Sequence, residues 1–294
     1  MKRTSADERP STTVRRRIWK VRLEHGRSDV RVQQDTLATE EPLEIRLHAS
    51  GGESVPISIT MRTPGNDFEL AAGFLFTEGI IRRPDAIERM EYCVGPFAEQ
   101  QYNTISVRLR PGVQVDTDRL ARHFYTTSSC GVCGKASLDS LRTQIPSWTD
   151  HSDVELSVSP AAIVSLPDRL REAQSVFDRT GGLHASGLFT ADGAVVGVRE
   201  DVGRHNALDK LIGHALLAGQ LPLRQHVLVV SGRASFELVQ KAAMAAIPVM
   251  IAVGAPSSLA AQAAEEFGIT LVGFARGLNF NVYTRPERVV GLSA

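Results

Sequence analysis

The sequence predicts an α/β protein in which a small, strand-rich α+β N-terminal domain precedes a three-layer α/β/α C-terminal domain. Two observations support this. From Trp19 to about Arg110, several segments alternate apolar and polar residues, as half-buried strands do. From about Ser159 onward, helical and strand patterns take turns, which is typical of a sheet covered by helices on both faces. We therefore divide the chain into a mobile tail (1–17), the α+β domain (18–125), a loop and linker (126–158) and the α/β domain (159–294).

The first domain contains three alternating segments and one helical segment. The polar residues 1–17 close with three arginines, and we expect no fixed structure there. Apolar residues at helical spacing predict a helix over 68–76. The strands are expected at 43–47, 57–61 and 105–109. After this domain, residues 146–153 have the composition of a linker.

The second domain is a succession of helices and strands. Its expected elements, in order, are a helix over 162–179, a strand or helix start at 184–189, a strand at 195–198, a helix over 202–217, a buried strand at 226–230, a helix over 235–246, a strand at 249–253, a helix over 258–267 and a strand at 270–274. Ligands of such sheets bind beyond the carboxyl ends of the strands. Three strands are followed by polar or glycine-rich turns, at 231–233, 254–258 and 275–279. We expect these turns to line one crevice.

Composition excludes several function classes. Thirty-three basic and thirty-three acidic side chains cancel, so no overall field attracts nucleic acid or an anionic membrane. No run approaches the ~20 apolar residues of a membrane span, and the N-terminal region lacks the apolar stretch of a secretory signal. We expect a cytoplasmic protein, in which free thiols persist.

Two of the three cysteines, Cys130 and Cys133, lie in the run Thr126–Lys135 among hydroxyl residues and glycines. A glycine-flanked loop beside Lys135 can expose a thiol and favour its thiolate. A structural zinc site is one interpretation, but it requires four ligands, and no second cysteine pair or HxxxH motif is present. A thioredoxin-like dithiol normally opens a long amphipathic helix, which the following residues do not predict. Two incidental surface cysteines are a third interpretation, and a carrier thiol that holds sulfur as a persulfide is the fourth.

The segment Arg199–Lys210 brings many charges to the start of a predicted helix. We expect Asp201 to be the N-cap, which places Arg204 and His205 in the first turn, where the helix dipole opposes cations. An anionic ligand would offset this cost. Alternatively, nearby carboxylates pair with these groups on a solvated face, and His184 is a structural histidine. Because several such clusters coincide with strand ends, we favour a pocket for a ligand that bears a pyrophosphate.

Six ordered motifs closely resemble the FdhD/NarQ family of formate dehydrogenase accessory sulfurtransferases. They are TTSSCGVCG (126–134), FDRTGGLHASGLF (177–189), REDVGRHNALDKLIG (199–213), SGRASFELVQKA (231–242), GAPSSLA (254–260) and GFARG (273–277). The resemblance implies a sulfurtransferase that takes sulfur from a cysteine desulfurase. It also implies delivery of this sulfur to the molybdenum cofactor, bis-molybdopterin guanine dinucleotide, for the formate dehydrogenase catalytic subunit. A homodimer is implied as well. The alternative from another class is a non-catalytic chaperone that binds the cofactor.

The resemblance also assigns roles to residues. Cys130 corresponds to the persulfide carrier, and residues 274–279 correspond to a cofactor-contacting stretch. We expect Cys133 either to release the sulfur or to protect the loop by closing a disulfide. The second domain is expected to resemble the cytidine deaminase fold. However, His184 and the segment 231–237 lack the glutamate and the two cysteines of a zinc deaminase. We therefore expect no zinc, no other metal site and no deamination.

The remaining cavity would suit a guanine dinucleotide, and guanine nucleotides should mimic the cofactor. We expect Arg204, Lys210, Arg233 and Arg276 to hold its phosphates. The full set of expected cofactor contacts is Thr180, Gly181, Gly182 and His184; Asp201, Gly203, Arg204, His205, Asn206 and Lys210; Ser231, Gly232 and Arg233; Gly254, Ala255 and Ser257; and Phe274, Ala275, Arg276, Gly277, Leu278 and Asn279.

Overall fold

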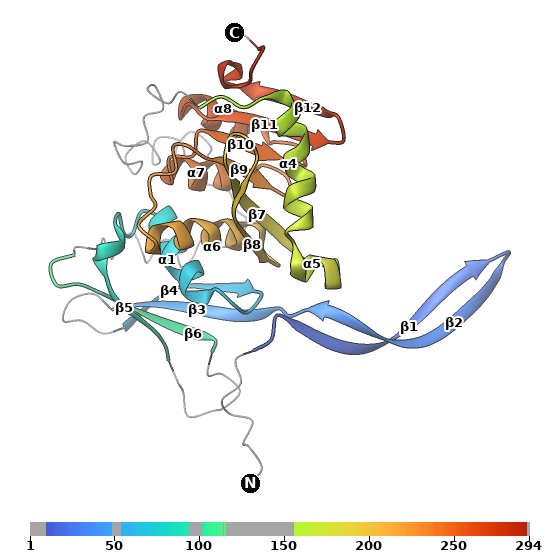
Figure 1. Cartoon of the computed structure of the whole chain (residues 1–294). Helices are drawn as coiled ribbons and strands as arrows, with labels where there is room; N and C mark the ends of the chain where they lie inside the picture. Colours follow the sequence, from blue (N-terminus) through green and yellow to red (C-terminus); the bar gives the residue numbers. More distant parts are fainter. Residues whose placement is uncertain (1–9, 49–53, 94–101, 114, 116–155, 293–294) are drawn as a thin grey trace.

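The computed structural model describes residues 10–48, 54–93, 102–113, 115 and 156–292. In this part of the chain the fold is mixed α/β with three sheets (Figure 1). The loop that carries Cys130 and Cys133, the region 116–155, lies outside the described residues. No helix of the described part has the length and apolar content needed to span a bilayer.

A two-stranded hairpin, β1 (Thr13–Glu24) and β2 (Arg27–Ala38), projects from the rest of the protein (Figure 1). Residues 13–17 therefore lie in a strand, and the prediction of a mobile tail is wrong for them. The sequence contains the reason: Trp19, Val21 and Leu23 alternate with charged residues, and His25 and Gly26 both adopt positive φ, as a tight hairpin turn requires. The many arginines of β1 obscured this alternation.

The three predicted strands and the predicted helix of the first half are observed, and a strand at Ile87–Tyr92, which the sequence did not predict, completes a four-stranded sheet. Leu43, Ile45 and Leu47 alternate along β3 and are buried, whereas the residues between them are only partly covered. β3 pairs in parallel with β6 and antiparallel with β4. The strand order is β4-β3-β6-β5, with β3 (Glu41–His48), β4 (Ser54–Arg62), β5 (Ile87–Tyr92), β6 (Thr104–Leu109) and the helix α1 (Asp67–Thr77).

The second half is built on a six-stranded sheet. β9, β10 and β11 run parallel, and β7, β8 and β12 extend the sheet antiparallel at its two sides. α4 lies on one face, while α6, α7 and α8 lie on the other (Figure 1). The order is β12-β11-β10-β9-β7-β8, with β7 (His184–Phe189), β8 (Val195–Asp201), β9 (Val227–Val230), β10 (Val249–Ala252), β11 (Thr270–Arg276), β12 (Asn279–Thr284), α4 (Pro160–Glu172), α5 (Ser175–Thr180), α6 (Arg204–Leu217), α7 (Phe236–Met244) and α8 (Ser258–Glu266).

The predicted elements of this half correspond to observed ones, with three differences. The helix expected over 162–179 is two helices, because the chain breaks at Gln174 between α4 and α5. α6 begins after Gly203, so Gly203 rather than Asp201 is its N-cap. β11 continues to Arg276 and turns back into β12, a strand that the sequence did not predict. The likeness to cytidine deaminases stays a prediction.

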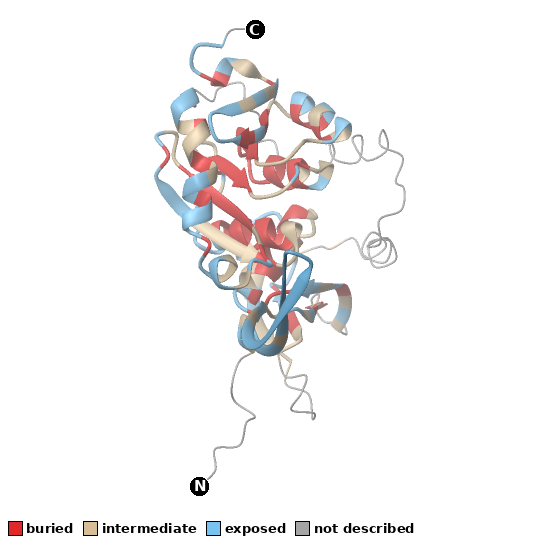
Figure 2. Ribbon diagram, turned by 90° about the vertical axis from the view of Figure 1, so that its right-hand side faces the viewer, coloured by how far each residue is buried: buried red, intermediate tan, exposed pale blue. Residues whose placement is uncertain are grey.

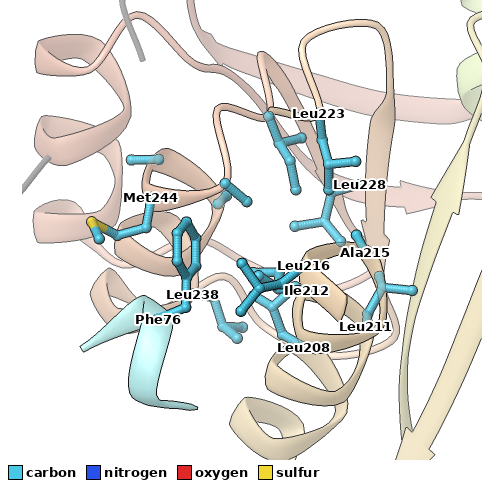
Figure 3. Close-up of a cluster of buried hydrophobic side chains, with 14 of the residues drawn as sticks. Phe76, Leu208, Leu211, Ile212, Ala215, Leu216, Leu223, Leu228, Leu238 and Met244 are labelled. Atoms are coloured by element: carbon cyan, nitrogen blue, oxygen red, sulfur yellow. The ribbon is translucent and has the colours of Figure 1, made fainter. Parts of the chain in front are cut away.

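Two apolar clusters pack on the two faces of the six-stranded sheet. Val229 and Ile251 face the cluster beneath α4, whereas Leu228 and Met250 face the larger cluster with α6, α7 and α8. In Figure 2 the buried residues, in red, lie in the interior of the protein, and the hairpin is exposed. Phe76 of α1 belongs to the larger cluster (Figure 3). One core therefore joins the two halves of the chain.

Helices α1 and α6 meet with their backbones in contact. A Cβ added to Gly73 would lie 1.9 Å from the carbonyl oxygen of Asp209, and one added to Gly213 would lie 1.9 Å from that of Glu69. Only glycine permits such an approach. Beside this crossing, the buried Lys241 Nζ lies 3.0 Å from Asp209 Oδ2 and 2.9 Å from Thr77 Oγ1. These contacts hold the α/β half against the first half of the chain. The contact region between the two halves is called the joint below.

Candidate functional site

A cavity of about 600 Å³ opens at one edge of the six-stranded sheet. It lies where β9, β10 and β11 end and β7 begins, which is where an α/β sheet is expected to hold a ligand. The prediction that these turns share a crevice is confirmed for Ser231 and for residues 275–277. Residues 254–258 do not line the cavity, and the residue that lines it after β10 is Val253. The lining residues are Pro167, Asp168, Leu170, Arg171, Gln174, Phe177, Gly181, Gly182, Leu183, His184, Val202, Ser231, Val253, Ala275, Arg276 and Gly277.

The strand ends form one side of the cavity. The Ser231 hydroxyl accepts a hydrogen bond from the Ala185 backbone N–H at 2.9 Å and lies 3.5 Å from His184 Nδ1. Burial, together with the positive charge of Arg204, lowers the pKa of His184. At neutral pH, His184 is therefore an uncharged imidazole that can exchange hydrogen bonds, rather than a cation that attracts phosphate.

Arg276 supplies positive charge at the end of β11. Its Nε donates to the backbone oxygen of Val253 at 3.2 Å, and its side chain is exposed. A β-bulge between Gly273 and Arg276 and the positive φ of Phe274 and Gly277 turn the chain here. Among the described residues this is the one hydrogen bond of the Arg276 guanidinium, so its other N–H groups can bind an anion in the cavity.

Helices α4 and α5 form the opposite side. The Arg171 guanidinium lies 4.5 Å from the centre of the Phe177 ring and pairs with Asp178 at 3.1 Å. The carboxylate of Glu200 accepts hydrogen bonds from the backbone N–H groups of Val176 and Phe177, at 2.9 and 2.7 Å. Glu200 thereby fixes the start of α5, and with it this wall of the cavity.

The residues of this wall were missed by the sequence interpretation. Asp168, Arg171 and Gln174 are three residues apart, so α4 and the break after it bring them to the same cavity. This spacing was the available signal.

The structure assigns a different role to three predicted contacts, Asp201, Asn206 and Lys210, which are buried between the two halves of the chain. Lys210 Nζ lies 2.7 Å from Asp201 Oδ2 and donates to the Thr63 carbonyl oxygen at 2.8 Å. Asp201 also accepts from the Thr63, Gly203 and Asn206 nitrogens at 3.1, 2.8 and 3.1 Å. Their polar atoms already bind partners between the two halves of the chain, so we no longer propose them as ligand contacts.

Arg204 and His205 begin α6 beside Glu237, outside the cavity lining. His205 Nε2 lies 3.2 Å from Ser235 Oγ, and burial together with the charges of Lys241 and Arg204 lowers the pKa of His205 to about 4. Arg204 Nε is buried and has no hydrogen-bond partner within the described ranges. The predicted crowding of cations at this helix start is confirmed, and His205 tolerates it by staying uncharged.

Some of the other predicted contacts make hydrogen bonds within and between the strand-end turns. The Gly254 N–H donates to the Gly232 oxygen and the Gly254 oxygen accepts from the Phe274 N–H, both at 3.0 Å. Ser257 caps α8 by accepting from the Ala260 N–H at 3.2 Å. The predicted residues that lie outside the cavity lining, besides those already described, are Thr180, Gly203, Gly232, Arg233, Gly254, Ala255, Ser257, Phe274, Leu278 and Asn279.

The thiol sites are only partly described. Cys130 and Cys133 lie outside the described residues, so their prediction as the reactive pair stays a prediction. Cys93 is half-buried, and burial raises the pKa of its thiol, which disfavours the thiolate at neutral pH. No group of three or more histidine, cysteine or acidic side chains that could hold a metal occurs among the described residues.

Comparison with known proteins agrees with the motifs. The chain is 54% identical over 279 residues to the sulfur carrier protein FdhD of Streptomyces avermitilis, an alignment that covers 94% of this chain and 95% of that protein. It is 50% identical over 275 residues to the sulfur carrier protein FdhD of Mycobacterium tuberculosis, covering 91% and 97%. A solved structure from Desulfotalea psychrophila, assigned as a formate dehydrogenase accessory protein, has a TM-score of 0.68 at 24% identity. That comparison covers 95% of this chain and 100% of the other, and it supports the fold alone. The FdhD/NarQ family model matches residues 38–290, and this chain belongs to the FdhD/NarQ family.

Proposed function

We propose that this protein is a sulfur carrier for formate dehydrogenase maturation. In this proposal Cys130 accepts sulfur from a cysteine desulfurase and passes it to bis-molybdopterin guanine dinucleotide held in the cavity. The observation that carries the proposal is the cavity at the strand ends, which Arg276 and the glycine pair Gly181 and Gly182 line. The names of relatives more than 50% identical, sulfur carrier proteins, favour the same conclusion.

The lining residues fit such a ligand. The guanidinium groups of Arg171 and Arg276 suit phosphate oxygens, and Gly181 and Gly182 let a ligand approach the backbone. Phe177 and its apolar neighbours suit a planar ring. Lys210, which was expected to bind phosphate, has no part in this proposal because it is buried in the joint.

Sulfur transfer to Cys130 is a thiol exchange. The Cys130 thiolate attacks the outer sulfur of the persulfide on the desulfurase, the S–S bond of that persulfide breaks, and the desulfurase leaves as its thiolate. Cys133 can then attack Cys130 Sγ, which forms a disulfide and releases the outer sulfur as hydrosulfide. Both steps conserve atoms and electrons, and the cysteine pair supplies the two electrons that reduce the carried sulfur.

A complementation experiment tests the carrier role. A strain that lacks its own copy of this protein receives the wild type, Cys130→Ala or the matched control Cys93→Ala, and formate dehydrogenase activity is measured. We expect Cys130→Ala to abolish activity and Cys93→Ala to retain it, with both variants present at wild-type levels. Full activity with Cys130→Ala would contradict the carrier role and favour a chaperone that only binds the cofactor.

We also propose that the protein acts in the cytoplasm as a homodimer, as the family resemblance implies. Its partners are then a cysteine desulfurase and the catalytic subunit of formate dehydrogenase. Sedimentation of the purified protein measures the dimer directly, and a monomer at micromolar concentration would contradict that part of the proposal.

A further inference from the structure

The hairpin of β1 and β2 has one apolar face that is open to solvent. Trp19, Val21 and Leu23 point to the same side of β1, and the register places Val32 opposite Trp19 and Val30 opposite Val21. These five side chains are between 50% and 77% exposed. The hairpin projects from the rest of the protein (Figures 1 and 2), and its residues before position 38 lie outside the family match.

Such a face requires a surface to cover it. A two-stranded hairpin alone is at best marginally stable in water, and a long apolar ribbon promotes aggregation. The helix α5 lies beside the base of β2, where a Cβ added to Gly182 would be 3.7 Å from the Cβ of Ala38. This contact supports the base of the hairpin, whereas Trp19, Val21 and Leu23 lie further out.

The charge of the hairpin indicates what kind of surface it can approach. Its two strands contain seven arginine or lysine and three acidic side chains, a formal charge of +4. Because the whole chain has a formal charge of zero, the rest of the chain has a formal charge of −4. Two hairpins therefore repel each other, whereas the hairpin of one copy is attracted to the body of another.

The size of the hairpin favours a symmetric exchange between two copies. Each strand has 12 residues and spans about 40 Å, and two strands are about 10 Å wide, so one hairpin covers roughly 400 Å². With a single different partner, the two surfaces together would bury about 800 Å², which is less than stable complexes bury. In a two-fold dimer each copy gives one hairpin and receives one, so about 1,600 Å² is buried, the standard size of a specific interface.

The outer face of the four-stranded sheet offers a matching apolar strip. The Thr60 hydroxyl donates to Asn206 Oδ1 on α6 at 3.2 Å, so its neighbours Ile59 and Met61 point away from the α/β half. Both side chains are exposed. Pro42 of β3 lies opposite Met61 and is exposed as well. We call Pro42, Ile59 and Met61 the β4 strip.

We propose that the hairpin is a dimerisation arm whose Trp19 face packs on the β4 strip of a second copy, while the hairpin of that copy returns the same contact. The inference rests on the homodimer of the proposed function and names the surfaces that form it. The apolar face provides the burial, and the opposite charges of arm and body set the orientation.

Sedimentation equilibrium of paired variants tests the arm. Trp19→Ala with Val32→Ala removes two directly opposed residues of the apolar face, and the matched control, Ile18→Ala with Gln33→Ala, removes the neighbouring opposed pair on the other face. The first double variant should raise the dimer dissociation constant at least about thirty-fold, because a buried tryptophan dominates such an interface. The control should stay within a few-fold of the wild type.

Photo-cross-linking tests the position of the arm without removing its apolar face. Benzoylphenylalanine replaces Val21, and copies labelled with heavy nitrogen are mixed with unlabelled copies before irradiation. We expect cross-linked peptides that join a labelled chain to an unlabelled one, with the reacted site in residues 54–62 of the second copy.

The outcomes separate this inference from the proposed function. A dimer that is unaffected by Trp19→Ala with Val32→Ala, or that forms no cross-link between copies at β4, overturns the inference and leaves the homodimer standing. A monomeric wild type overturns both, and its binding to vesicles of anionic lipid through the hairpin would make a membrane the occupant of this face. Sulfur loading of Cys130, measured on the same samples, tests the carrier role separately.

Discussion

Lys210 offers the clearest separation between a residue that binds a ligand and one that holds the fold. It was expected to contact phosphate, yet its Nζ lies 2.7 Å from Asp201 Oδ2 in the joint between the two halves. Lys210→Met keeps the unbranched side chain, one atom shorter, and removes the charge. The substitution leaves the carboxylate of Asp201, which is 0% exposed, without its cation, and it leaves the Thr63 carbonyl oxygen without its donor.

The size of the stability loss depends on which hydrogen-bond donors Asp201 retains. Removal of one partner from a buried ion pair costs roughly 3–5 kcal/mol. Asp201 retains three N–H donors, from Thr63, Gly203 and Asn206, which continue to stabilise the carboxylate. We therefore expect the lower end, a loss of about 3 kcal/mol in the free energy of unfolding.

Urea denaturation, followed by tryptophan fluorescence, measures this loss of stability. The rise in melting temperature caused by GDP measures whether the cavity still binds a nucleotide. Lys210→Met should be much less stable than the wild type and should still respond to GDP below its melting temperature. The opposite pattern, wild-type stability with no response to GDP, would refute the assignment of Lys210 to the joint and restore it as a ligand contact.

Three more predictions concern the cavity, the helix crossing and pH. Arg276→Ala should reduce the GDP-induced rise in melting temperature with little change in ligand-free stability, because the side chain is exposed; an undiminished rise would remove Arg276 from the site. Gly73→Ala should destabilise the protein by about 2 kcal/mol, because the added Cβ overlaps the Asp209 carbonyl oxygen. The control Gly197→Ala should be neutral, because the nearest atom to its added Cβ would be 3.7 Å away. Equal urea midpoints for the two variants would disprove the close helix crossing. His205 has a pKa of about 4 in the folded state and about 6.5 when unfolded, so its contribution to stability is complete above pH 6.5 and is lost as pH falls toward 4. His205→Gln should reduce the loss of stability between pH 7 and 5, and an unchanged pH dependence would contradict the lowered pKa.

Much of the fold follows from the order of residues alone. The alternation of Leu43, Ile45 and Leu47 and the apolar run Val227–Val230 each specify a strand through local pattern, and both are confirmed. The glycine-rich turns after parallel strands predicted that Ser231 and Arg276 share one crevice, and both line the cavity. These features are local, so the sequence displays them directly.

What the sequence concealed depends on contacts between distant segments. The local sequence around Lys210 and Asp201 is compatible with two roles, binding a ligand or binding Thr63. Only the tertiary packing determines which role they have. Gln174 is an unremarkable polar residue until the break between α4 and α5 buries it. A buried polar group can be recognised only when its surroundings are known.

The carrier role of Cys130 is tested most directly by following sulfur itself. The protein is incubated with a cysteine desulfurase and isotopically labelled cysteine, and its peptides are analysed by mass spectrometry without reduction. The account predicts one added, labelled sulfur atom on the peptide that contains Cys130, and none on the Cys93 peptide. Labelled sulfur that appears on no cysteine, or equally on all three, would contradict it.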